Sequence, residues 1–312
     1  MADNKEIDQP TGTEKVGHEW DGIEELNTPL PRWWLWTFYA TIVFAVFYMV
    51  AYPAWPMLHS ATPGVLGWSS RGQLEKELSK DQQRKAAIRQ AIAQTPIEQL
   101  PANPRLMKAA IEGGRSVFKV TCVQCHGSGA TGSKGFPNLN DDDWLWGGDI
   151  ATIDKTITDG VRQPGHAATR TSQMLAFGRD GILQPAQIAD VAAYVRTISH
   201  QQKPNAASAR GARVFAENCV ACHGPQGKGD RTFGAPNLTD FIWLYGGDTA
   251  TIVETVTNGR QGVMPAWSTR FDPVTLKMLA AYVYSLGGGE RQPPMLAAAP
   301  APATGTGSDG KP

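Results

Sequence analysis

The longest apolar run of the chain lies near its beginning. Residues 33–70 contain no Asp, Glu, Lys or Arg. Within them, the stretch from Trp34 to Tyr52 is apolar enough, and about long enough, to cross a bilayer as one helix. Aromatic side chains flank it at both ends, as at membrane interfaces, and Pro53 ends it. A buried core helix is the alternative, but the missing charges favour a transmembrane anchor over residues 33–58.

The segment before the anchor is polar and acidic. Residues 1–32 carry three Lys or Arg against eight Asp or Glu. No apolar run opens the chain, so we expect no cleavable signal peptide. A disordered tail is one interpretation. A docking segment is the other, because Trp20 and spaced aliphatic residues are of no use to a pure spacer.

A connector is expected after the anchor, over residues 59–108. Residues 72–94 are rich in Lys, Glu, Gln and Ala, with Leu and Ile at helical spacing. This pattern predicts an amphipathic helix lying over the membrane or a partner. Prolines at positions 96, 101 and 104 then break the chain into a linker.

An internal repeat occupies most of the remaining chain. Residues 114–118 recur at 211–215, and residues 144–149 recur at 243–248. Each copy predicts a first helix, a glycine-rich loop, a middle helix and a final helix.

The repeat predicts a mainly α protein with two tandem small all-α domains, over residues 109–200 and 208–287. Their final helices are expected at 185–199 and 273–286. Domains of this size bury little surface, so they need an additional stabilising group. Residues 288–312, rich in Pro, Ala and Gly, are predicted to be disordered.

The four cysteines occur in two copies of C-x-x-C-H, the attachment pattern of c-type haem. The two thiols bond to one porphyrin, and the histidine binds its iron. A zinc site would bring two cysteine pairs into one small module, and a disulfide framework needs no histidine after each pair. We therefore predict two covalently bound haem c groups, which also supply the missing apolar core. The predicted residues are Cys122, Cys125 and His126 in the first copy, and Cys219, Cys222 and His223 in the second.

Methionine suggests the second iron ligand. Met264 follows His223 by 41 residues in a loop rich in Gly and Pro. In the first repeat the candidates are Met174 and His166, and His166 follows His126 by 40 residues. Counted back from the final helix, Met174 fits better, so it is favoured and His166 is kept as the alternative. A methionine closes the iron and raises its potential, which suits electron transfer.

Charge balance and the site of haem attachment limit the possible partners and the location of the protein. Lys plus Arg and Asp plus Glu number 29 each, so no nucleic-acid partner is indicated. No nucleophile, paired acids or phosphate loop stand out. Bacterial c-type haem is attached outside the cytoplasm. We therefore expect a single-pass protein of a bacterial inner membrane, in contact with lipid, with a cytoplasmic N-terminus and periplasmic haem domains.

Together these features resemble one family, the dihaem subunit III of cbb3-type cytochrome c oxidases (CcoP or FixP). The resemblance covers residues 18 to about 287. It is carried by His18-Glu19-Trp20-Asp21-Gly22-Ile23, by Pro29-Leu30-Pro31-Arg32-Trp33-Trp34, by one anchor and two haem modules, and by two Trp-Leu-x-Gly-Gly-Asp stretches. It implies two class I-type cytochrome c domains in an oxygen-reducing, proton-pumping complex of a proteobacterial inner membrane.

The resemblance also implies partners and ligands. The chain would not be an enzyme alone. It would pass electrons from a soluble cytochrome c donor towards a monohaem cytochrome c subunit and the haem–copper catalytic subunit. Met174 and Met264 become the distal iron ligands, each serving its own module's haem or the other's. An anchored dihaem shuttle, or a cytochrome subunit of another periplasmic dehydrogenase complex, is the alternative. A dihaem peroxidase is disfavoured by two Met-ligated irons.

Overall fold

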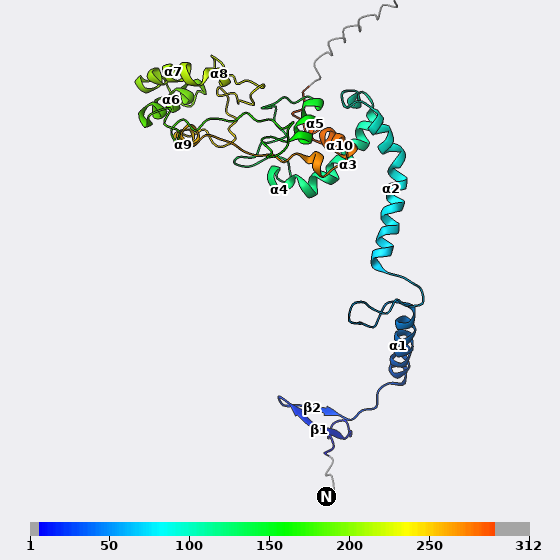
Figure 1. The fold of residues 1–312 in the computed structure, drawn as a ribbon. Helices are drawn as coiled ribbons and strands as arrows, with labels where there is room; N and C mark the ends of the chain where they lie inside the picture. Colours follow the sequence, from blue (N-terminus) through cyan, green and yellow to red (C-terminus); the bar gives the residue numbers. More distant parts are fainter. Residues whose placement is uncertain (1–5, 291–312) are drawn as a thin grey trace, which may run out of the picture. The chain divides into compact units, whose positions relative to one another are not determined.

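The computed structural model describes residues 6–290, which are mainly helical (Figure 1). Two compact units divide the chain, the first ending at Arg84 and the second beginning at Lys85. The elements are, in order, β1 (Lys15–Trp20), β2 (Ile23–Leu26), α1 (Arg32–Ala51), α2 (Ser70–Gln94), η1 (Ile97–Ala102), α3 (Pro104–Thr121), α4 (Val123–His126), α5 (Ile150–Asp159), α6 (Pro185–Ile198), α7 (Ala206–Asn218), α8 (Val220–His223), α9 (Thr249–Asn258), η2 (Trp267–Thr269) and α10 (Pro273–Tyr284).

The acidic N-terminal segment forms a β-hairpin, which the sequence analysis did not predict. Strands β1 and β2 pair antiparallel, with Trp20 opposite Ile23. The turn residues Asp21 and Gly22 both have positive φ, 54° and 85°, as a two-residue hairpin turn requires. Trp20 and Ile23 are 68% and 70% exposed, so the hairpin displays apolar side chains.

The predicted apolar helix is confirmed as α1. Among the described residues it is the one helix long and apolar enough to cross a membrane, and its apolar window has no buried residue within the protein. The helix begins directly after Pro31 and ends at Ala51, and Tyr52 has extended backbone.

The predicted connector helix is confirmed as α2, but only its end is packed. Leu74 and Leu78 are exposed, whereas Ile92 is fully buried. Lys277 donates to the carbonyl oxygen of Ala93 over 3.0 Å, which satisfies a carbonyl that lacks a partner at a helix end. The last turns of α2 therefore belong to the second unit.

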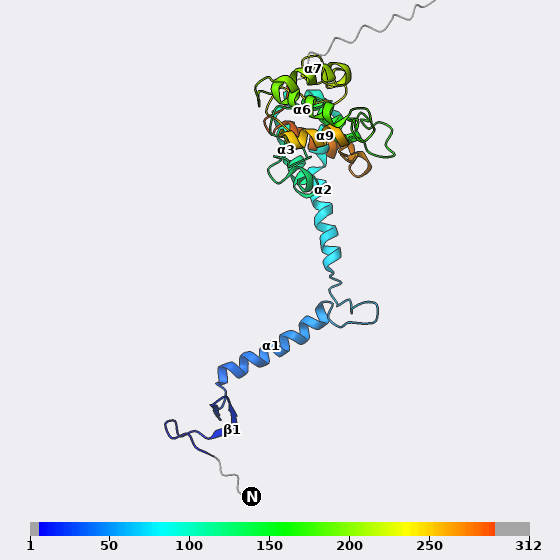
Figure 2. The same ribbon diagram turned by 90° about the vertical axis from the view of Figure 1, so that its left-hand side faces the viewer.

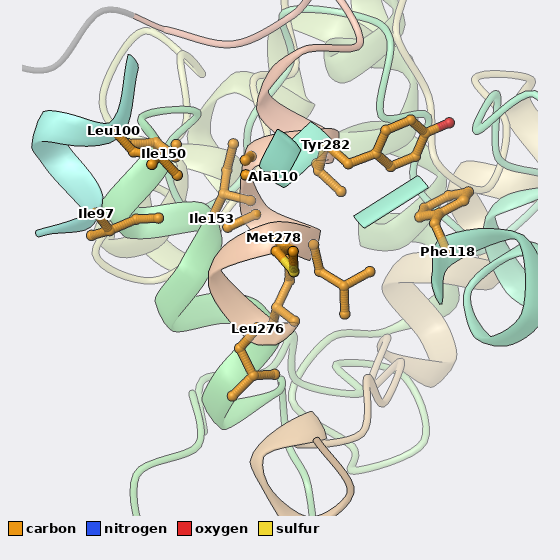
Figure 3. Packing of buried hydrophobic residues seen from close by; sticks show 14 of the residues in the cluster. Ile97, Leu100, Ala110, Phe118, Ile150, Ile153, Leu276, Met278 and Tyr282 are labelled. Atoms are coloured by element: carbon orange, nitrogen blue, oxygen red, sulfur yellow. The ribbon is translucent and has the colours of Figure 1, made fainter. Parts of the chain in front are cut away.

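Among the described residues, the second unit contains two apolar cores. The first joins η1, α3, α5 and α10, and Figure 3 shows Phe118, Ile153 and Tyr282 among its side chains. The second joins α6, α7 and α9 around Val191 and Phe215. The two predicted final helices are confirmed as α6 and α10, with ends within two residues of those expected.

The final helices are exchanged between the repeats. Helix α10 ends the second repeat in sequence but packs on α3 and α5 of the first. Helix α6 ends the first repeat but packs on α7 and α9 of the second. Figures 1 and 2 show α6 beside α7, and Figure 1 shows α10 beside α3. The ranges 109–200 and 208–287 therefore describe sequence repeats, and each packed core draws on both.

Equivalent glycines let α10 pack closely on α3 and α6 pack closely on α7. A β-carbon at Gly114 of α3 would overlap the carbonyl oxygen of Met278 in α10. A β-carbon at Gly211 of α7 would overlap the carbonyl oxygen of Asp190 in α6. Because these neighbours are backbone atoms, only glycine fits at either crossing without moving a helix.

Candidate haem centres

Both C-x-x-C-H segments have the same local structure. Helix α3 ends at Thr121, Cys122 caps it, and a single turn, α4, follows. Helix α7, Cys219 and the turn α8 repeat this arrangement. The turn ends at a glycine with positive φ in both copies, 78° at Gly127 and 74° at Gly224. The chain therefore reverses immediately after each histidine.

Each histidine is held in one tautomer. His126 Nδ1 lies 3.0 Å from the carbonyl oxygen of Pro137, and His223 Nδ1 lies 3.1 Å from that of Pro236. A carbonyl only accepts, so Nδ1 carries the proton and Nε2 keeps a lone pair for a metal. Burial lowers the pKa of both rings, which also favours the neutral form.

The cysteine thiols of each pair differ in environment. Cys122 and Cys219 are partly buried, and burial raises the pKa of each thiol to about 11. Cys125 and Cys222 are exposed. All four are free thiols, so no disulfide competes with their bonding to a porphyrin.

Met264 pairs with the first repeat. Its backbone N–H donates to the carbonyl oxygen of Val161 over 2.9 Å, and the Val161 N–H returns a bond of 2.9 Å. Gly160, with φ of 68°, lies against the Met264 carbonyl, where a side chain would collide. The methionine packs against the core that contains α3. It therefore belongs to the half of the second unit that carries Cys122 and His126.

Met174 pairs with the second repeat in the equivalent way. Its N–H donates to the Arg260 carbonyl over 3.3 Å, and the Arg260 N–H donates back over 3.4 Å. Gly259, with φ of 70°, lies against the Met174 carbonyl. The methionine packs against the core that contains α7. The loops that carry the two methionines are thus exchanged together with the final helices.

His166, the alternative to Met174, has a partner of its own. Its Nε2 lies 3.2 Å from Oδ1 of Asp159, at the end of α5. Burial opposes ionisation of Asp159, but hydrogen bonds from Lys155 and His166 outweigh it and hold the pKa of this carboxyl below its ordinary value. His166 therefore lies beside a carboxylate of the first repeat.

Loops of the two repeats interlock between the centres. The Gly135 N–H donates to the Leu244 carbonyl over 2.7 Å. A side chain at Gly135 would meet the ring of Tyr245, and one at Gly234 would meet the ring of Trp146. The two centres therefore belong to one interlocked body.

The residues present fit c-type haem. Each half offers two thiols at the end of a helix, an imidazole Nε2 with a free lone pair, and a thioether on a loop that pairs with the residues just after α5 or α9. This N and S donor set is that of a six-coordinate c-type haem iron. No group of three or more His, Cys, Asp or Glu suited to a metal ion occurs among the described residues.

The fold and the two centres define a protein with two cytochrome c domains that follow a candidate membrane anchor in the sequence. Three family models match the chain: cytochrome c over residues 111–199, cytochrome c oxidase, cbb3-type, subunit III over residues 206–283, and the N-terminal domain of cytochrome oxidase-cbb3, FixP, over residues 12–59. The cytochrome c domains imply binding of haem c.

Similar proteins cover nearly the whole chain. The cbb3-type cytochrome c oxidase subunit FixP of Bradyrhizobium sp. (strain ORS 278) is 54% identical over 93% of this chain and 100% of its own length. FixP of Azorhizobium caulinodans is 53% identical over 91% and 96%. Subunit CcoP of Cereibacter sphaeroides is 52% identical over 88% and 95%. The chain belongs to the FixP/CcoP family of cbb3-type cytochrome c oxidase subunits, which confirms the resemblance and the fold class predicted from the sequence.

Proposed function

We propose that this chain carries electrons from a soluble cytochrome c donor towards the haem–copper catalytic subunit of a cbb3-type oxidase. The observation that supports the proposal is the matched pair of donor sets, each with two thiols, one oriented histidine and one methionine loop, which together would close a haem iron. A closed iron suits electron transfer, because no position is left for a substrate. When bound, c-type haem supplies a one-electron iron couple, and the chain's own residues set its ligands and surroundings.

The ligand sets follow from the exchanged packing. His126 and Met264 serve the haem held by Cys122 and Cys125, as the Met264–Val161 pairing supports. His223 and Met174 serve the haem held by the second cysteine pair, which the Met174–Arg260 pairing supports. Neither repeat then completes a centre alone, because each centre takes its methionine from the other repeat.

The same packing favours transfer between the two haems. The loops that follow the two C-x-x-C-H turns interlock through Gly135 and Gly234. Interlocking holds the two centres in one body, so the separation between them does not depend on the motion of one domain against another. The chain itself performs no bond-making chemistry in this account.

Helix α1 and the hairpin support a proposal for the membrane position and for one partner contact. Helix α1 anchors the protein in a bacterial inner membrane with its N-terminus in the cytoplasm, because c-type haem is attached on the periplasmic side. The exposed Trp20 and Ile23 of the hairpin suit docking on a neighbouring oxidase subunit. The other partners are the monohaem cytochrome c subunit and the catalytic subunit, whose complex reduces oxygen and pumps protons.

Gentle purification through a tag on this chain tests the proposal. Reduced-minus-oxidised spectra are recorded with and without carbon monoxide, together with oxygen uptake from a reduced soluble cytochrome c. We expect two c-type haems per chain closed to carbon monoxide, together with b-type haem, a carbon-monoxide-binding haem and oxygen uptake.

Recovery of c-type haem alone, from detergent in which the oxidase is shown to survive, would favour the anchored shuttle. Carbon monoxide binding or peroxide turnover by the isolated chain would overturn closed ligation and favour an enzyme.

A further inference from the structure

Two arginine side chains stack on aromatic rings at equivalent places in the two repeats. The guanidinium of Arg170 lies 4.7 Å from the ring centre of Trp146, and that of Arg260 lies 4.2 Å from the ring centre of Tyr245. Trp146 and Tyr245 are equivalent residues of the Trp-Leu-x-Gly-Gly-Asp stretches. Both repeats therefore place a cation at the same point, just before α5 in one and α9 in the other.

The two arginines come from different positions of the repeat. Arg260 directly follows Gly259, whereas Val161 stands in that place in the first repeat. Arg170 instead comes from the longer loop of the first repeat, and its backbone pairs with Val161. The loop of the first repeat thus supplies, through Arg170, the guanidinium that Val161 cannot supply at the position equivalent to Arg260. Because arginines from two different places in the repeat stack on equivalent rings, Trp146 and Tyr245, we infer that a cation is required beside this ring.

Both guanidinium groups have a buried nitrogen without an acceptor among the described residues. In Arg170 this is Nε, while Nη2 donates to Thr156 Oγ1 over 3.4 Å. In Arg260 it is Nη2, while Nε donates to Thr255 Oγ1 over 3.0 Å and Nη1 to Glu254 Oε1 over 3.2 Å. Buried donors almost always have an acceptor, because an unpaired buried donor destabilises the folded protein. Burial also lowers the pKa of Arg170, and the charges of Asp159 and Asp149 oppose this shift.

Both arginines lie beside a methionine loop. Arg260 pairs directly with Met174, and Arg170 pairs with Val161, which in turn pairs with Met264. Each arginine therefore lies in a backbone segment that is paired, directly or through Val161, with the methionine of one centre. Haem carries two propionate carboxylates, and a guanidinium is the side chain best suited to hold a carboxylate.

We propose that Arg170 donates to a propionate of the haem held by Cys122 and Cys125, and that Arg260 donates to a propionate of the other haem. This inference rests on the proposed haem binding. Both arginines are positioning residues, because they act on the iron through the propionate. By keeping the carboxylate ionised, each one removes proton uptake from the redox step of its own haem.

The test uses the purified oxidase complex with Arg170→Gln or Arg260→Gln in this chain. The control is Arg179→Gln, which makes the same charge change at a side chain 60% exposed and paired with Asp180. Each c-haem potential is measured from about pH 5 to about pH 8, the range into which burial moves a carboxyl pKa. Haem per chain is measured separately and tests the proposed function.

Each glutamine variant should lower the potential of one haem and make that potential fall as pH rises. The reason is that the unpaired propionate then takes up a proton on reduction. Arg170→Gln should affect one haem and Arg260→Gln the other, while Arg179→Gln leaves both unchanged. If a glutamine variant loses haem, Arg170→Lys and Arg260→Lys are measured in its place. Because lysine keeps the positive charge, the haem potential should depend on pH less steeply than is expected for glutamine.

Two haems per chain with pH-independent potentials in all the variants would overturn the arginine assignment alone. Fewer than two haems in the parent protein would overturn the proposed function instead.

Discussion

Replacing Gly114 by alanine tests the crossing of α3 and α10 within the first core. The added methyl group would overlap the carbonyl oxygen of Met278 and the β-carbon of Tyr282. A backbone carbonyl cannot relieve the overlap by changing rotamer as a side chain can, so α10 must move away from α3. Gly113→Ala is the matched control, because its methyl group would lie 2.6 Å from Cε of Met278, the end of a flexible side chain.

The two substitutions share one favourable effect and differ in one unfavourable effect. Alanine in place of glycine stabilises a helix interior by about 1 kcal/mol. Overpacking at Gly114 costs about 1–3 kcal/mol, so Gly114→Ala should lower the free energy of unfolding by up to about 2 kcal/mol. Gly113→Ala should leave it unchanged or raise it by up to about 1 kcal/mol.

Thermal unfolding of the purified full-length protein measures the difference. One kcal/mol corresponds to about 2–4 °C in midpoint for a body of this size, so Gly114→Ala should unfold several degrees below Gly113→Ala. Equal midpoints for the two variants would refute the close contact between α3 and α10, and with it the exchange of the final helices.

Three further substitutions have expected outcomes, at Gly211, Asp154 and His166. Gly211→Ala should lower the free energy of unfolding by up to about 2 kcal/mol, because overpacking against α6 costs about 1–3 kcal/mol and alanine in place of glycine returns about 1 kcal/mol. Below the unfolding temperature it should leave unchanged the iron–methionine absorption band of the haem held by Cys122 and Cys125. Burial raises the pKa of Asp154 to about 6, with Lys277 opposing, so the free energy of unfolding falls as the pH rises from the ordinary carboxyl pKa through 6. Asp154→Asn should therefore raise the free energy of unfolding by roughly 1–2 kcal/mol at pH 7.5, and this gain should shrink towards pH 4. A gain that persists at pH 4 would contradict this cause. His166→Ala should leave both iron–sulfur bands intact, whereas loss of one band would show that His166 supports that centre.

Much of each centre is predictable because its chemistry is local. The C-x-x-C-H spacing places thiols and imidazole on one turn, and Pro137 follows His126 closely enough for its carbonyl to reach the ring. Apolar periodicity and the initial prolines also predict α6 and α10 with nearly their observed ends.

The exchange of final helices has no local signal. Helices α6 and α10 carry similar apolar faces, with Tyr194 and Tyr282 at equivalent places, so each pattern fits α3 or α7 equally well. Tyr282 packs against Phe118 at 5.1 Å between ring centres, and Tyr194 against Phe215 at 5.2 Å. An internal repeat makes the two arrangements alike in sequence, and only the three-dimensional path of the connecting loops separates them.

The hairpin and Arg170 were missed for different reasons. Asp21-Gly22 is a turn signal, but the flanking strands are acidic and mostly exposed, so no alternation of apolar residues marks them. Arg170 lies in the loop present only in the first repeat, so comparison of the repeats offers no counterpart, and only the stacking on Trp146 identifies it.

Assigning each methionine to its haem tests the central claim most directly. Cys219→Ser with Cys222→Ser leaves the haem at Cys122, and Met264→Leu or Met174→Leu, which nearly conserve volume, is then added. The absorption band of the iron–sulfur bond reports ligation. The exchanged arrangement predicts that the band disappears with Met264→Leu and persists with Met174→Leu. Loss of the band with Met174→Leu and its persistence with Met264→Leu would contradict the account.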